Sequence, residues 1–183
     1  MSPTPDFSTM RRILIIGSSG SGKSTLAKHL GKRLDLPVIH LDAHYWNPGW
    51  METPAEEWAS KVHTLIQGEA WVMDGTYSST LEPRIAAADT IVFLSFSRWR
   101  CLWWVFKRRI RYRNRTRPDM APGCPERMEW DFVHYVLMYP NTLKPGILKK
   151  LDAARETKQV VVLETPREVE RFVHAMRQVP TSS

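Results

Sequence analysis

Residues 13–25 have the sequence ILIIGSSGSGKST, and this stretch decides the fold. The part from Gly17 to Ser24 matches the pattern G-x-x-x-x-G-K-[ST] in full. The apolar run before Gly17 is typical of a strand buried on both faces, and leucines at helical spacing follow Thr25. A strand, a glycine-rich loop and a helix in this order predict a loop whose backbone N–H groups hold phosphates.

The residue types in this loop fit a nucleoside triphosphate with its metal ion, so we expect ATP and Mg²⁺ as cofactors. Lys23 would reach the β- and γ-phosphates as a catalytic residue, and the Ser24 hydroxyl would coordinate Mg²⁺. No guanine-reading N/TKxD pattern follows the fourth predicted strand, which favours ATP over GTP. The expected nucleotide-binding residues are Gly17, Ser18, Ser19, Gly20, Ser21, Gly22, Lys23, Ser24 and Thr25.

Further apolar strands alternate with amphipathic helices along the chain. The predicted strands after the first are residues 37–41, 70–73, 90–96 and 159–163. This alternation predicts an α/β fold, in which helices cover both faces of a parallel sheet. We expect a single domain over residues 10–178, with a disordered tail at 1–9 and a second tail at 179–183. The aromatic, turn-rich residues 44–51 are expected to form a loop.

Composition and charge narrow the class of protein. The 183 residues include 26 Lys and Arg, 19 Asp and Glu, and two cysteines, Cys101 and Cys124, which we expect to be free thiols. No apolar leader or membrane-length apolar run is present, so we expect a cytoplasmic protein without a membrane partner. The segment from Arg98 to Arg117 holds nine Lys and Arg and no acidic residue. Such a segment needs a negatively charged partner.

The basic segment begins in a predicted helix over about 99–113 and continues into a loop. We favour a lid formed by this loop, with Arg109, Arg115 and Arg117 as catalytic residues that stabilise a transferring phosphoryl group. A solvated basic face and contact with nucleic acid remain the alternatives. The helix has an apolar face, which we expect to pack on the sheet. Its residues are Trp99, Leu102, Trp103, Phe106 and Ile110.

Two aspartates end predicted strands, where parallel sheets bind their ligands. Asp74 ends the third strand and would hold Mg²⁺ through its water shell, or it forms a plain Asp-Gly turn. Asp42 ends the second strand and would accept a proton from an acceptor hydroxyl or orient it, or it is a helix cap. Trp46 and Trp50 follow Asp42 and would either stack on an acceptor or pack in the core and lid, while Trp58 is expected in the core.

These stretches resemble the small P-loop kinase superfamily, which includes adenylate, shikimate and gluconate kinases. More closely, they resemble the bacterial topology modulation proteins and adenylate-kinase-like ATPases. The resemblance spans about residues 11–165 and is carried by GSSGSGKST, HLDAHYWNPGW, WVMDGTYSSTLEPR, the arginine-rich block and QVVVL. It implies a three-layer fold with five parallel strands in the order 2-3-1-4-5, and a lid contributed by about residues 114–130. By similarity, Arg84 would lie at the acceptor site.

The site therefore supports two hypotheses. The first is a phosphotransferase that moves the ATP γ-phosphoryl group to a small acceptor, such as a nucleoside, nucleotide or sugar-like molecule, bound by Asp42, Trp46, Trp50 and Arg84. The alternative is an ATP-dependent regulator that contacts nucleic acid through the basic segment, modulates DNA topology and hydrolyses ATP weakly. We favour the phosphotransferase because the expected packing of the aromatic residues leaves little of that helix for nucleic acid, and no nucleic-acid-binding motif is recognisable.

Overall fold

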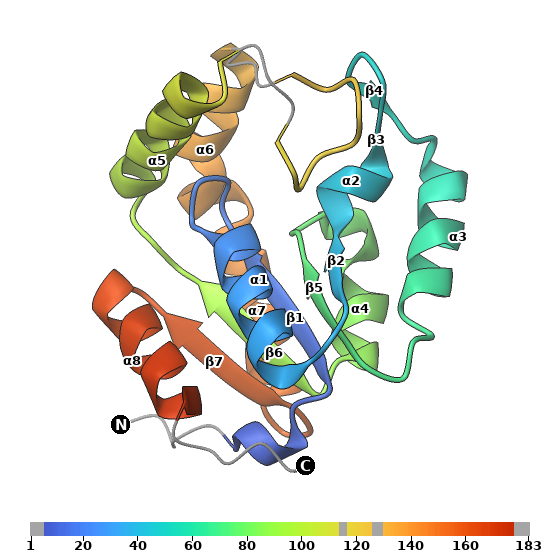
Figure 1. The fold of residues 1–183 in the computed structure, drawn as a ribbon, viewed down its shortest axis with the longest axis vertical. Coiled ribbons are helices and arrows are strands. Elements are labelled where there is room, and N and C mark those ends of the chain that lie inside the picture. Colours follow the sequence, from blue (N-terminus) through green and yellow to red (C-terminus); the bar gives the residue numbers. More distant parts are fainter. Residues whose placement is uncertain (1–5, 114–116, 126–129, 178–183) are drawn as a thin grey trace.

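The computed structural model describes residues 6–113, 117–125 and 130–177 and has a five-stranded parallel sheet at its centre (Figure 1). The strands lie in the order β2-β5-β1-β6-β7, which is 2-3-1-4-5 when the sheet strands are counted along the chain, as expected. Their bounds are β1 (Arg12–Gly17), β2 (Val38–His40), β5 (Trp71–Asp74), β6 (Thr90–Leu94) and β7 (Gln159–Leu163).

The register of the central strands brings their carboxyl ends to one edge. Asp74 at the end of β5 pairs with Ile15 of β1 on one side and with His40 of β2 on the other. Gly17, the last residue of β1, pairs with Leu94 at the end of β6. Residues 17–25, which we predicted to bind phosphates and call the phosphate-binding loop, therefore start from the same edge as Asp74 and as the segment that follows β2 and contains Asp42.

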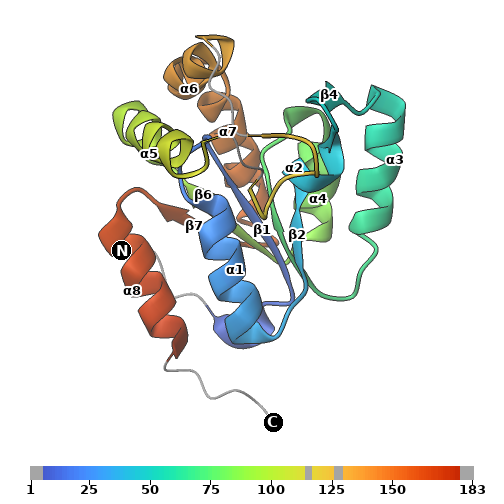
Figure 2. The same cartoon turned by 45° about the horizontal axis from the view of Figure 1, so that its top comes forward.

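Helices cover both faces of the sheet, so the fold has three layers (Figures 1 and 2). One apolar cluster packs α3, α4 and α7 on the sheet, and the other packs α1 and α8 on the opposite face. The helices of the described residues are α1 (Lys23–Leu34), α2 (Leu41–Tyr45), α3 (Ala55–Leu65), α4 (Leu81–Ala87), α5 (Arg98–Arg111), α6 (Trp130–Thr142), α7 (Lys144–Ala154) and α8 (Pro166–Arg177). None of them combines the length and apolar character needed to cross a membrane.

The segment 44–51, expected to be a loop, contains regular structure. Its first two residues belong to the short helix α2, and the rest enters an antiparallel hairpin of β3 (Trp46–Asn47) and β4 (Met51–Glu52). Gly49 and Trp50 have positive φ angles of 79° and 63° in the connection, which closes the hairpin tightly. This β3–β4 hairpin stands above the carboxyl edge of the sheet (Figure 1).

The expected disorder of residues 1–9 is wrong for the part that the structure describes. Phe7–Thr9 forms a 3-10 helix capped by the Asp6 carboxylate, which accepts a hydrogen bond from the Ser8 N–H. Phe7 is buried, with its ring centroid 5.4 Å from that of Phe172 in α8. Apolar contact with α8 therefore orders this segment, whereas residues 1–5 and 179–183 lie outside the described residues.

The expected packing of α5 on the sheet is also wrong. The helix stands beside α6 above the carboxyl edge rather than against a sheet face (Figures 1 and 2). Its fully buried residues are Cys101 and Val105, which face the phosphate-binding loop. Four of the five residues that were expected to pack on the sheet are largely exposed, namely Trp99 (72%), Trp103 (55%), Phe106 (46%) and Ile110 (62%). The fifth, Leu102, is half-buried.

Candidate active site

The phosphate-binding loop, residues 17–25, has the backbone that its sequence predicts. Gly17, Gly20 and Gly22 have φ angles of 149°, 79° and 91°, a region that side chains rarely adopt. At Gly20 an added Cβ would lie 2.3 Å from the Cys101 carbonyl oxygen, so the close approach of α5 also requires glycine. The loop then enters α1, whose N-terminal N–H groups begin at the same place.

Lys23 folds back over the loop. Its Nζ donates hydrogen bonds to the carbonyl oxygens of Gly17 and Ser18 at 3.0 and 2.9 Å. Burial lowers the pKa of the Lys23 ammonium, and the negative charges of Asp42 and Asp74 oppose this shift. A partly desolvated cation at the mouth of this loop favours an anionic ligand.

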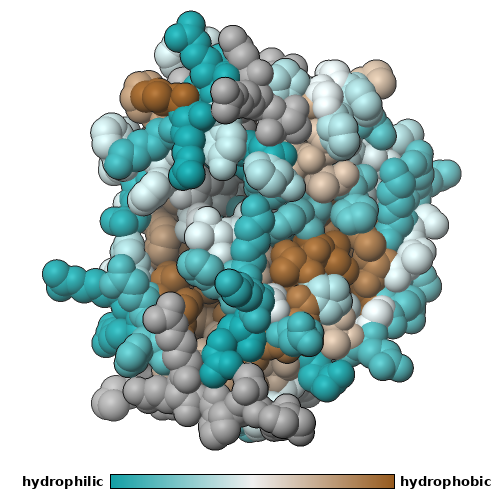
Figure 3. Space-filling view, viewed as in Figure 1, coloured by the Kyte–Doolittle hydropathy of each residue, from teal (hydrophilic) through white to brown (hydrophobic). Residues whose placement is uncertain are grey.

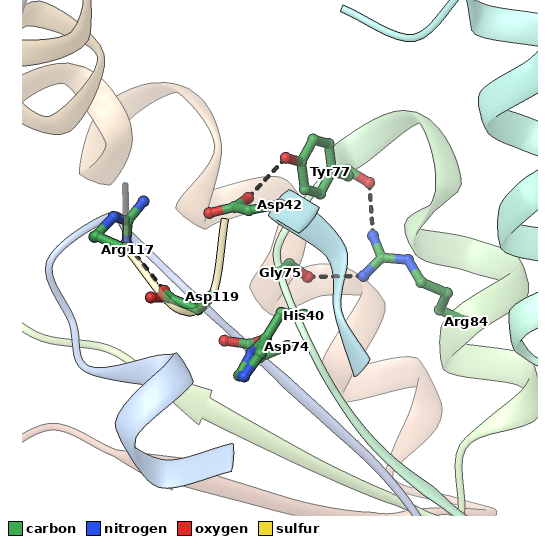
Figure 4. Close-up of polar contacts among 8 residues, drawn as sticks. All are labelled: His40, Asp42, Asp74, Gly75, Tyr77, Arg84, Arg117 and Asp119. Carbon is green, nitrogen blue, oxygen red and sulfur yellow. Dashed lines mark hydrogen bonds and ion pairs between the residues drawn. The ribbon is translucent and has the colours of Figure 1, made fainter. Parts of the chain in front are cut away.

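The described part of the expected lid, residues 117–125, closes over the loop and contacts the hairpin. Arg117 Nη1 lies 3.0 Å from Asp119 Oδ2, and both side chains are buried (Figure 4). On the other side of this lid segment, Gly49 N–H donates to Gly123 O at 3.0 Å and Trp50 Nε1–H donates to Pro125 O at 3.0 Å. The lid segment therefore contacts the β3–β4 hairpin through its backbone, and it contacts the phosphate-binding loop through a hydrogen bond between Asp119 and the Ser24 side chain.

The residues around Ser24 fit a magnesium ion. Asp74 is buried at the end of β5 and its Oδ1 lies 2.7 Å from His40 Nδ1, which fixes the carboxylate (Figure 4). Burial raises the pKa of Asp119, but the Arg117 charge and a hydrogen bond from the Ser24 side chain outweigh it and lower that pKa overall. Ser24, Asp74 and Asp119 line one cavity.

Mg²⁺ is commonly bound by one or two carboxylates together with phosphates and water, and this oxygen donor set suits it. Among the residues that the structure describes, no three His, Cys, Asp or Glu side chains are grouped to hold a metal ion by themselves. Phosphate oxygens would complete such a site.

Two adjoining cavities meet at the phosphate-binding loop. The cavity that contains Ser24 and Asp74 has a volume of about 480 Å³, and a second of about 460 Å³ lies between the hairpin, the lid segment and α6. Both are lined by the same six residues, namely Ser19, Lys23, Asp42, Gly75, Arg108 and Arg117. A more open cavity of about 1320 Å³ lies on the far side of the loop, between α1, α5 and α8.

Asp42 lies in the wall between the two smaller cavities. Its Oδ1 accepts a hydrogen bond from Tyr77 Oη at 2.7 Å (Figure 4). Burial and the Asp42 charge raise the pKa of Tyr77 far above its usual value, so the phenol stays a donor. Tyr77 follows Asp74 by three residues but was not predicted as a site residue, because a tyrosine after a strand end has no distinctive sequence pattern.

The second cavity has aromatic walls. Trp46, Trp50, Tyr77, Phe132 and Tyr135 line it together with Glu52 and Met120. Burial raises the pKa of Tyr135 to about 12, so its hydroxyl is also a donor at neutral pH. Trp46 and Trp50 contact each other edge to face, with centroids 5.3 Å apart, and also pack against Met120 and Ala121 of the lid segment. Trp58 is buried in the core as predicted.

The structure contradicts the expected position of Arg84 at an acceptor. Its side chain is fully buried in α4 and lines none of the three cavities. Its Nε, Nη1 and Nη2 groups donate hydrogen bonds of 2.6–2.9 Å to the carbonyl oxygens of Gly75, Thr76, Tyr77 and Thr80. Figure 4 shows the guanidinium approaching Gly75 and Tyr77 from α4. Arg84 therefore holds the segment after β5 in shape.

The arginines of the basic segment have different positions. Arg117 lines both smaller cavities as expected, but Arg109 lines neither, and Arg115 lies outside the described residues. Arg108 takes the expected place of Arg109. It follows the buried Cys101 and Val105 by seven and three residues, and this helical spacing turns it toward the phosphate-binding loop. The spacing was visible in the sequence, but the burial of Cys101 and Val105, which sets the inner side of α5, was not.

Comparison with solved structures finds many similar chains, and three kinases are among them. Shikimate kinase from Acinetobacter baumannii in complex with shikimate is 17% identical over 96% of each chain, with a TM-score of 0.57. The chain has the fold of the P-loop kinases. The chain is also similar to shikimate kinase from Bacteroides thetaiotaomicron, with 20% identity over 93% of this chain and 98% of that one and a TM-score of 0.49. It is similar to deoxyadenosine kinase from M. mycoides as well, with 12% identity over 90% of this chain and 96% of that one and a TM-score of 0.48.

Comparison with protein-family models finds no match. Comparison with curated proteins also finds none. The fold of the P-loop kinases hosts several activities, so the function must be argued from the site.

Proposed function

We propose that this protein transfers the γ-phosphoryl group of Mg-ATP to a hydroxyl group of a small acceptor. The observation that carries the proposal is the wall shared by two adjoining cavities, in which Lys23 and Asp42 belong to both. One cavity contains the residues suited to phosphates and a metal ion, and the other has the aromatic walls suited to an organic acceptor. Such an arrangement brings two reactants together at one point.

The triphosphate would lie along residues 17–25, with its nucleoside toward the open cavity beside α8. Ser24 and, through water, Asp74 would hold Mg²⁺, and Asp119 lies close enough to Ser24 to join them. When bound, Mg²⁺ neutralises charge on the β- and γ-phosphates. Lys23 would exchange its bonds to the Gly17 and Ser18 carbonyl oxygens for bonds to those phosphates.

The acceptor would lie in the aromatic cavity with its hydroxyl at Asp42. The hydroxyl oxygen attacks the γ-phosphorus, the bond from that phosphorus to the β–γ bridging oxygen breaks, and ADP leaves. Asp42 accepts the hydroxyl proton, while Tyr77 holds the carboxylate through its 2.7 Å hydrogen bond. Flat aromatic walls suit a nucleoside, a nucleotide or a sugar-like molecule.

Three cations surround the point where charge develops. Lys23, Arg108 and Arg117 all line both cavities, and cations fixed at the transferring group stabilise the transition state. The lid segment, held to the hairpin through Trp50 and Gly49, restricts water at the same point. Exclusion of water favours transfer to the acceptor over hydrolysis.

The alternative is an ATP-dependent regulator that contacts nucleic acid, and one argument against it does not hold. The aromatic residues of α5 are exposed rather than packed on the sheet, so they are accessible to a partner. The positions of Arg108 and Arg117 still favour phosphoryl transfer, because both side chains line the cavities at the phosphate-binding loop.

Substitution of Asp42 tests the proposal. In Asp42→Asn the carboxamide keeps the shape but cannot take the proton, so acceptor-dependent turnover should fall by about 10²–10⁴ while the affinity for Mg-ATP is kept. Turnover is measured as ADP release over a panel of nucleosides, nucleotides and sugars, and affinity by calorimetry. Asp35→Asn is the matched control, because Asp35 is exposed at the end of α1 and its φ of 53° suits asparagine. Wild-type turnover in Asp42→Asn would contradict the proposal.

A further inference from the structure

Helix α5 carries an exposed apolar stripe that points away from the rest of the molecule. Trp99, Trp103, Phe106 and Ile110 are spaced by four, three and four residues, which aligns them along one side of a helix. Between 46% and 72% of each residue is exposed. We call these four residues the aromatic face of α5. The opposite side of the helix, with Cys101 and Val105, is buried against the phosphate-binding loop.

Cations flank the aromatic face on both sides. The helical period places Arg98 and Arg109 along one margin and Arg100, Lys107 and Arg111 along the other. The segment from Arg98 to Arg117 has no acidic residue. In the space-filling view an apolar group at the outer end of α5 lies next to hydrophilic side chains (Figure 3). The surface is thus apolar along its centre and positive along its margins.

We propose that the aromatic face of α5 docks on an anionic lipid surface. A helix with tryptophan and phenylalanine on one side and lysine and arginine beside them lies in the plane of a membrane interface, with its apolar side among the acyl chains and its cations at the head groups. The fourteen residues of α5 form a helix of about 21 Å, long enough to lie along such a surface.

The charges and ring contacts argue against two other partners. A two-fold related second copy would bring identical cation-flanked stripes together, and like charges would oppose the contact. A single-stranded nucleic acid would need free ring faces for its bases to stack on. Here Lys107 Nζ lies over both the Trp103 and Trp104 rings at 5.2 and 5.3 Å, and Trp103 stacks against Phe106.

Docking through the three aromatic residues of this face would leave the cavities open to ligands. Trp99, Trp103 and Phe106 line none of the three cavities. Ile110, at the C-terminal end of the face, lines one cavity, and Arg108, on the inner side of the helix, lines two. The helix would therefore bind lipid on its outer side and hold the phosphate-binding loop on its inner side. The proposal does not depend on the identity of the acceptor.

Sedimentation of the full chain with lipid vesicles tests the proposal. We expect binding to vesicles of phosphatidylcholine and phosphatidylserine in equal amounts at least about tenfold stronger than to phosphatidylcholine alone, and weaker in high salt. The variant Trp99→Ser/Trp103→Ser/Phe106→Ser should lose at least about tenfold in binding to the anionic vesicles. These side chains are exposed, so its unfolding temperature and ATP affinity should be kept. Met51→Ser is the control, because Met51 is 63% exposed but lies on the β3–β4 hairpin.

Several results would overturn the proposal. One is the absence of binding to phosphatidylserine vesicles, and another is equal binding by the triple variant and the wild type. A dimer in sedimentation velocity that the triple variant abolishes, without vesicle binding, would assign the face to a second copy. Binding of a single-stranded oligonucleotide that the triple variant loses, again without vesicle binding, would assign it to nucleic acid.

Discussion

Replacement of Arg84 by methionine should destabilise the protein without a direct effect on acceptor binding. The guanidinium makes four hydrogen bonds to carbonyl oxygens, of which those to Gly75, Thr76 and Thr80 are buried. A buried polar group left without its partner costs about 1–3 kcal/mol, so the lower value at the three buried carbonyls gives a loss of about 3 kcal/mol. Because single domains are stable by about 5–15 kcal/mol, the variant should remain folded but weakly so.

Urea unfolding measures this loss directly. Arg84→Lys keeps three donors and should lose less stability than Arg84→Met. Arg155→Met is the matched control, because Arg155 is exposed and pairs across 3.2 Å with Asp152 on the surface, so its loss should be below about 1 kcal/mol. If Arg84→Met had wild-type stability and a raised KM for the acceptor, Arg84 would contact the acceptor and the structural role would be refuted.

Three further predictions concern the site. Tyr77→Phe removes the hydrogen bond to Asp42 and should lower acceptor-dependent kcat about tenfold with unchanged ATP affinity; an unchanged kcat would exclude this positioning role. Gly20→Ala should reduce the free energy of unfolding in urea by about 2–3 kcal/mol, since φ at this position is 79° and the added Cβ would lie 2.3 Å from Cys101 O. Gly146→Ala is the control, because Gly146 lies in α7 with no atom within 4 Å of an added Cβ, and this change should raise the free energy of unfolding by about 0.5–1 kcal/mol. Equal unfolding midpoints for these two variants would show that position 20 has no special requirement for glycine. Trp50→Phe removes the bond to Pro125 O and should raise acceptor-independent ATP hydrolysis; no rise would mean that the lid segment excludes water without that bond.

The sequence predicted the sheet and the phosphate-binding loop because both depend on local patterns. The apolar strands, the helical periods between them and the full G-x-x-x-x-G-K-[ST] match define the order of elements, and glycine is the residue that best satisfies the backbone at positions 17, 20 and 22. The sequence placed Asp42 at the carboxyl edge of the sheet but not in its local structure, because β2 ends at His40 and Asp42 lies in the first turn of α2.

Long-range contacts explain what the sequence did not predict. The apolar period of α5 was visible, but a period does not state what the stripe faces, and here the stripe faces outward while Cys101 and Val105 pack inward. Arg84 was assigned to the acceptor site by the resemblance to small P-loop kinases, although the turn of α4 directs its guanidinium to the backbone after β5.

The contacts of the lid segment could not be predicted from the sequence either. Gly49 and Trp50 of the hairpin meet Gly123 and Pro125 across more than seventy residues of chain, and no local pattern records such a pairing. The interaction of His40 with Asp74 arises in the same way, from two strands that are adjacent in the sheet and distant in the sequence.

The most direct test of the account follows the γ-phosphoryl group itself. The protein is incubated with Mg-ATP labelled at the γ-phosphate and with each acceptor of the panel, and the label is separated into phosphorylated acceptor and free phosphate. The account predicts that one acceptor class receives most of the label and that Lys23→Ala abolishes the transfer. Label released to water alone, at a rate that no small acceptor changes, would contradict a phosphotransferase.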